Sequence, residues 1–195
     1  QDISHRMENP EAPRLLESFY VAASELGPLL GICFLQLPPQ LGPDRLPLLK
    51  RLLSLSPPSI RLAVEFRHPA WFRDGRLIDP AFEALEKLRV GTVITDVAGR
   101  REVSHSSLTA PWVLIRYLGN YGHPTTEERL EHWSQRLDRW FSQGLEELYF
   151  FVHEHDNLNA PEIARQFVQR MHSNTATHRL TDWKRWDVPD QLSLI

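Results

Sequence analysis

Five short β-rich runs alternate with amphipathic stretches along the chain, and this alternation limits the fold more than any other feature of the sequence. Between the runs, apolar residues recur at steps of three and four, as they do on one face of a helix. Repeated βα units of this kind form a parallel sheet. The runs cover residues 31–37, 60–67, 91–96, 112–118 and 148–153.

The number of runs predicts an α/β fold of the TIM-like (β/α) barrel type. An eight-stranded barrel takes about 250 residues, or about 30 for each unit, so five runs in this chain correspond to about the last five strands of eight. The first residue is not methionine, and we expect about 70 to 90 further residues before Gln1 in the natural protein. A complete, open five-stranded sheet is the alternative that the length permits.

Helix signals divide the chain further. Helices are predicted over residues 13–26 and 44–55, and others are predicted to begin at a capping box opened by Thr125, at Asp79 before a proline, and at Asn159. We assign residues 1–172 to the barrel portion. Residues 173–195 lose the pattern and are predicted to form an irregular tail that docks through its two tryptophans.

Composition narrows the partners and the compartment. A net charge of -3 provides no basic field for nucleic acid or an anionic membrane. The single cysteine, Cys33, cannot form an internal disulfide and favours a reducing, cytoplasmic location. No apolar run is long enough to span a membrane. Phosphate-binding loops, nucleophile elbows and dinucleotide fingerprints are also absent from the sequence, which leaves the identity of any cofactor unknown.

The run at 60–67 carries the most informative pair. Alternation along a strand places Glu65 and Arg67 on one face and Phe66 on the other, so an acid and a base point together toward the barrel interior. Two buried charges must pair with each other, with other polar groups or with a ligand. A structural ion pair is the alternative to a functional one.

Neighbouring strand ends also carry polar side chains, and the carboxyl ends of parallel strands are where barrel sites lie. The pattern therefore predicts one polar pocket. In the loop after residues 60–67, His68 is a candidate acid–base group, and Trp71 is either an apolar wall or ordinary packing. The candidates at the other strand ends are Gln36, Asp96, Arg116, Tyr117, Asn120 and Tyr121.

The last run leads into two histidines, His153 and His155, which would lie on one side of an extended segment. This spacing occurs in divalent metal sites when a carboxylate such as Asp96 or Glu65 completes the site. Histidines that are hydrogen-bonded within a loop are the favoured alternative. We therefore assign no metal ligand.

Two strings, at residues 30–39 and 63–71, resemble the uncharacterised family called domain of unknown function 72, or YecE-like. The resemblance implies a TIM-like barrel, adds His5 and Asn159 to the candidate site, and supplies no reaction. Leu118 departs from the family's usual histidine, and a lysine typical of the family would lie before Gln1. Further matching positions are Ile3-Ser4-His5, Asp96, Arg116 with Gly119, Asn159-Ala160 and Gln191-Leu192-Ser193-Leu194.

The leading hypothesis is an enzyme that acts on a small polar or anionic metabolite. Arg67 and Arg116 would bind the anion, and Glu65, Asp96 or His68 would transfer protons. A binding or scaffold protein without chemistry is the main alternative, and a metal-dependent nuclease is a third. The sequence predicts neither the substrate nor the oligomeric state.

Overall fold

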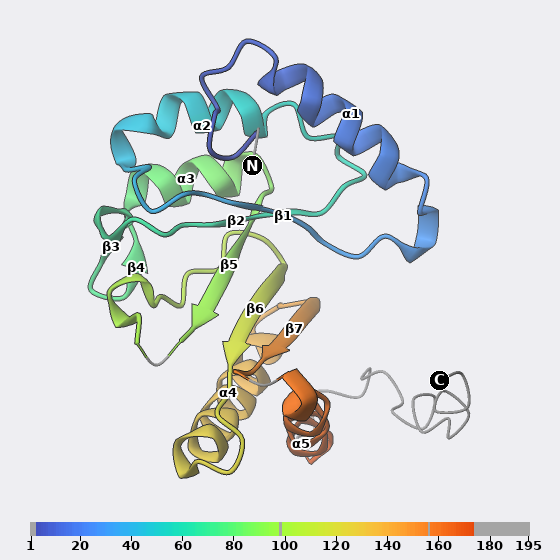
Figure 1. The fold of residues 1–195 in the computed structure, drawn as a ribbon, viewed down its shortest axis with the longest axis vertical. Coiled ribbons are helices and arrows are strands. Elements are labelled where there is room, and N and C mark those ends of the chain that lie inside the picture. Colours follow the sequence, from blue (N-terminus) through green and yellow to red (C-terminus); the bar gives the residue numbers. More distant parts are fainter. Residues whose placement is uncertain (1–2, 98, 156, 174–195) are drawn as a thin grey trace. The chain divides into compact units, whose positions relative to one another are not determined.

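The computed structural model describes residues 3–97, 99–155 and 157–173 (Figure 1). The chain divides into two compact units, of which the first contains Gln1–Leu118 and Leu145–Phe151. The second contains Gly119–Gly144 and Val152–Ile195. Apart from Ser173, the predicted tail lies outside the described residues.

Each of the five predicted runs contributes a strand to one five-stranded sheet. Its order is β1-β2-β5-β6-β7, and the pairs β1/β2, β2/β5 and β5/β6 are parallel. The sheet is not closed among the described residues, so the structure establishes an α/β fold with a mostly parallel sheet and does not confirm a barrel. The strands are β1 (Cys33–Gln36), β2 (Leu62–Glu65), β5 (Gly91–Asp96), β6 (Trp112–Leu118) and β7 (Glu147–His153).

Helices α1 (Ala12–Ser24), α2 (Leu46–Leu53) and α3 (Asp79–Lys87) belong to the first unit. In Figure 1 they lie on one side of β1 and β2. A small hairpin of β3 (Phe72–Arg73) and β4 (Arg76–Leu77) follows β2, and its turn contains Asp74 and Gly75, both with positive φ. An Asp-Gly pair tolerates this backbone, because Gly lacks a Cβ and Asp is among the residues that adopt it most readily.

The two faces of the sheet differ in what they contact. Leu62, Val64 and Phe66 pack in the large core under the helices, whereas Ala63 packs with Val93 and Leu114 on the opposite face. We call this second face, which bears Ala63, Val93 and Leu114, the inner face. The predicted division of residues 60–67 between two faces is therefore confirmed for these core residues.

The described part of the second unit holds two α-helices, α4 (Pro124–Ser142) and α5 (Ala160–His172). The capping box predicted at Thr125 is wrong, because α4 begins at Pro124 and the His123 ring accepts a hydrogen bond from the Thr125 amide. Thr126 instead bonds both backbone groups of Asn120. Helix ends shift by a residue when a neighbouring side chain can reach the same free amides.

The other two predicted caps also differ. Asp79 is the first residue of α3 and follows Ile78, which makes no side-chain cap. Asn159 precedes α5 as predicted, but its side chain makes no capping bond. None of the described helices is long and apolar enough to cross a membrane. Short 3-10 helices cover Gly27–Leu29, Pro43–Arg45, Pro69–Trp71, Arg101–Val103 and Asn157–Asn159.

Candidate functional site

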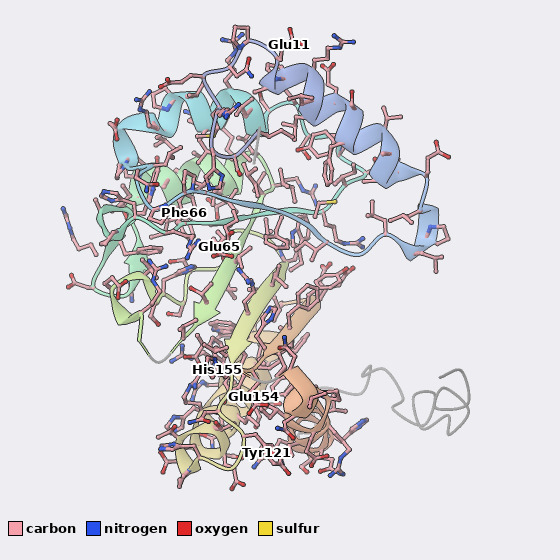
Figure 2. All side chains as sticks on the ribbon, viewed as in Figure 1. Glu11, Glu65, Phe66, Tyr121, Glu154 and His155 are labelled. Carbon is pink, nitrogen blue, oxygen red and sulfur yellow. The ribbon has the colours of Figure 1, made fainter. Side chains whose placement is uncertain are left out.

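Glu65, at the carboxyl end of β2, is the centre of a charged group in the first unit (Figure 2). It is 3% exposed. Its Oε1 accepts a hydrogen bond of 2.7 Å from Gln36 Nε2, and its Oε2 accepts one of 2.6 Å from Arg116 Nη1. Each oxygen of the buried carboxylate therefore has a donor, which offsets the loss of its hydration.

The strand register explains this meeting. Gln36 on β1 lies directly beside Glu65 on β2, and Arg116 on β6 lies beside Thr95 on β5. Side chains alternate between faces, so Arg116 shares the inner face with Leu114, as Glu65 does with Ala63. Because β5 lies between β2 and β6, the long arginine side chain crosses β5 to reach Glu65.

Two guanidinium groups face this single carboxylate. Arg67 Nε lies 3.8 Å from Glu65 Oε1, too far for a strong hydrogen bond, while Arg116 also lies over the ring of Phe34, 5.8 Å from its centroid. The side chains of Arg67 and Arg116 are 33% and 27% exposed. Positive charge thus exceeds negative charge here, and both forks retain accessible donors of the kind that bind carboxylates and phosphates.

The two predicted residues of the following loop have different environments. His68 is half-buried, and its Nδ1 accepts a hydrogen bond from the Ala70 amide. Trp71 is fully buried, packs on Phe66 and donates a hydrogen bond of 2.6 Å to the Leu41 carbonyl. Trp71 is therefore an ordinary packing residue of the core and not an apolar wall of the predicted pocket.

Asp96 and Tyr117 are not on the inner face. They pair with each other across β5 and β6, one residue beyond the pair of Thr95 and Arg116, so their side chains alternate to the opposite face. Both are buried, and the Tyr117 ring stacks on that of Phe150. The alternation of side chains along a strand is enough to predict this orientation from the sequence. The same alternation places Thr95 on the inner face, and Thr95 was not among the predicted site residues.

Other predicted residues lie in the second unit. Asn120 and Tyr121 are exposed, as are His153 and His155, and Asn159 is half-buried. Figure 2 labels Tyr121, Glu154 and His155 in this unit. The loop after β6 is held to the loop after β7 by a hydrogen bond from the Tyr121 amide to Glu154 Oε1, and Glu154 is buried.

His5 lies in the first unit, exposed and bonded through Nδ1 to the Ser4 hydroxyl. It lines a pocket of about 270 Å³ together with Gln40 and Arg45. Neither Glu65 nor Arg116 lines this pocket. Among the residues that the structure describes, no three His, Cys, Asp or Glu side chains are grouped closely enough to hold a metal ion.

The protein is an α/β protein with a charged group at the carboxyl ends of its parallel strands. In α/β proteins of this class, functional sites usually lie at these strand ends. The chain belongs to the family described as "Protein of unknown function DUF72", whose model matches residues 1–186. The resemblance seen in the sequence is therefore confirmed.

Known relatives are longer than this chain. The UPF0759 protein YecE of Escherichia coli K12 is 30% identical over 179 residues, which cover 83% of this chain and 65% of the relative. The protein of the same name from Escherichia coli O157:H7 matches to the same extent. The chain thus spans about 65% of the length of these curated relatives.

Solved structures of the family share the fold. A DUF72 family protein from Thermotoga maritima has a TM-score of 0.64 at 21% identity, covering 88% of this chain and 70% of that one. One from Enterococcus faecalis has a TM-score of 0.62 at 17% identity, covering 80% and 69%. At these identities the similarity establishes the fold alone.

Proposed function

We propose that the inner face binds a small polar or anionic metabolite at the carboxyl ends of the strands, and that the protein is an enzyme acting on it. The observation that supports this proposal is the pairing of buried Glu65 with Arg116, beside a second partly exposed cation, Arg67. A carboxylate that orients one of two guanidiniums leaves the other donors free to bind an anion.

Each residue then has a distinct role. Arg116 and Arg67 bind the anionic group. Glu65 holds Arg116 in place by accepting its hydrogen bond, and Gln36 holds Glu65 by donating to its other oxygen. His68 is the acid–base candidate best suited to proton transfer, because its Nε2 is not used in the bond with Ala70. Asp96 would act from the opposite face of β5 only after a change in its side-chain direction.

We further propose that this sheet is part of a (β/α) barrel. Each strand of the sheet lies beside the previous one in chain order once the β3/β4 hairpin is set aside. A doubly wound sheet reverses its strand order at a switch point, whereas a barrel does not. The carboxyl ends of barrel strands are also the usual place for a site. We expect the protein to act in the cytoplasm, where Cys33 stays reduced.

Calorimetric titration with inorganic phosphate tests the binding role. We expect saturable binding by the unaltered chain and at least a tenfold weaker affinity for Arg116→Gln, which equals about 1.4 kcal/mol. Arg51→Gln is the matched control, because Arg51 is an exposed arginine on α2 outside the charged group. Equal affinity in all three proteins, or no binding by any, contradicts the proposal.

A non-catalytic scaffold is the second candidate, and the complete pairing of the Glu65 oxygens supports it. In a scaffold the same residues would only stabilise the sheet. Arg116→Gln would then lower the unfolding free energy, and the unaltered chain would bind no phosphate. The titration separates the two functions, because the bond between Arg116 and Glu65 stabilises the sheet in both.

A further inference from the structure

A cavity of about 600 Å³ lies in the first unit at the end of the sheet opposite to Glu65. It is lined where the chain enters the strands, by Ile60 and Arg61 before β2, Val90 before β5 and Trp112 at the start of β6. Its volume is within the usual range for small-ligand sites, which is about 300 to 1,000 Å³.

Arg89, which lines this cavity, has a backbone conformation that favours glycine. Its φ is 53°, in the left-handed region, and it follows Leu88, the residue that caps α3. The Val90 amide donates to the Leu85 carbonyl and the Arg89 amide to that of Glu86, which is the hydrogen-bond pattern of a Schellman motif. Glycine would fit the position with less strain, and strain retained beside a cavity suggests that the side chain has a function.

The cavity lining holds three cations and two carboxylates, and only one of the cations has a carboxylate partner among the described residues. Arg61 Nη2 lies 2.6 Å from Glu147 Oε1, and the Tyr149 hydroxyl donates to Glu147 Oε2. Lys87 and Arg89 are both exposed, and neither is paired with another described residue. Glu146 is the remaining carboxylate of the lining.

We propose that this cavity binds a small organic anion with an apolar body. Lys87 and Arg89 contact the anionic group, and Trp112 with Ile60 provides the surface on which the apolar body packs. This site is distinct from the proposed function, because it lies at the amino ends of the strands and uses none of the residues around Glu65.

The test uses two fluorescent probes of similar shape and different charge. The probe 8-anilino-1-naphthalenesulfonate carries a sulfonate, and N-phenyl-1-naphthylamine lacks it. We expect Arg89→Gly to weaken binding of the sulfonate probe at least fivefold, to leave binding of the uncharged probe unchanged, and to raise the melting temperature. Lys87→Gln should weaken binding of the sulfonate probe and leave binding of the uncharged probe unchanged.

Asp74→Gly is the matched control, because Asp74 also has a positive φ but lies in the β3/β4 turn, outside the cavity lining. It should leave the affinity for both probes unchanged. The proposal is overturned if Arg89→Gly binds the sulfonate probe as tightly as the unaltered chain does. It is also overturned if Arg89→Gly loses affinity for both probes to the same extent. The same holds if Asp74→Gly weakens binding of the sulfonate probe as much as Arg89→Gly does.

Discussion

Arg116 Nη1 lies 2.6 Å from Glu65 Oε2, and the two residues come from strands separated by β5. A double-mutant cycle with Glu65→Gln and Arg116→Gln should give a coupling free energy of about 1 to 3 kcal/mol, because the carboxylate is buried and the arginine is largely so. Urea unfolding of the four proteins measures it.

The surface pair Glu162 and Arg165 on α5 provides a control for this cycle. Its geometry is also close, with Nη2 and Oε1 2.6 Å apart, but solvent screens both charges. We expect a much smaller coupling for it. Equal couplings for the two pairs would show that burial of Glu65 adds nothing to its interaction with Arg116.

His105 makes stability depend on pH. Burial lowers the pKa of its ring from 6.5 to about 4, against the smaller opposite effect of its bond to the Val93 carbonyl. The Ser107 amide donates to the other ring nitrogen, so the fold holds the neutral ring. The stabilisation that comes from the neutral His105 ring is complete above pH 6.5. It is lost as the pH falls toward 4, because His105 binds a proton in the unfolded chain at a higher pH than in the folded one.

Urea unfolding at pH 7 and pH 5 measures this effect. Between pH 7 and pH 5 the unfolding free energy of the unaltered chain should fall by about 2 kcal/mol more than that of His105→Gln. The expected loss is about 1.4 kcal/mol for each pH unit below 6.5. His132→Gln, at an exposed position on α4, is the matched control for the removal of one histidine. The same slope in His105→Gln and the unaltered chain would refute this role.

Gly91, the first residue of β5, has no room for a side chain. An added Cβ would lie 2.9 Å from Trp112 Nε1 and 3.3 Å from the Trp112 carbonyl oxygen. Gly91→Ala should therefore lower the unfolding free energy by about 1 to 3 kcal/mol, as overpacking does. Gly99→Ala, where no atom of the described residues lies within 4 Å of an added Cβ, should change the unfolding free energy little. Thermal unfolding compares the two, and a neutral Gly91→Ala would contradict the close packing.

The strands were predictable because their apolar runs are continuous. The predicted run at 91–96 matches β5, and the one at 112–118 matches β6. The observed β1 and β2 are shorter than predicted, because a ladder includes only the residues that a neighbouring strand can pair. Closure of the sheet depends on pairing between distant segments, which apolar periodicity does not encode.

The charged group was predictable only in part. Alternation correctly separated Glu65 from Phe66, but the strong partner of Glu65 is Arg116, 51 residues later, and Arg67 is the weaker one. Periodicity gives the face of a side chain, whereas reach across a neighbouring strand depends on sheet twist and rotamer. The prediction that Arg116 and Tyr117 both belong to one pocket overlooked that adjacent residues of a strand point to opposite faces of the sheet.

The most direct measurement of the central claim is anomalous diffraction from crystals of this protein soaked in selenate, a tetrahedral anion. We predict a selenium peak within hydrogen-bond distance of the guanidinium groups of Arg116 and Arg67, and its loss in Arg116→Gln crystals soaked in the same way. Selenium peaks only at other surfaces, with these two guanidiniums unoccupied, would contradict anion binding at the inner face.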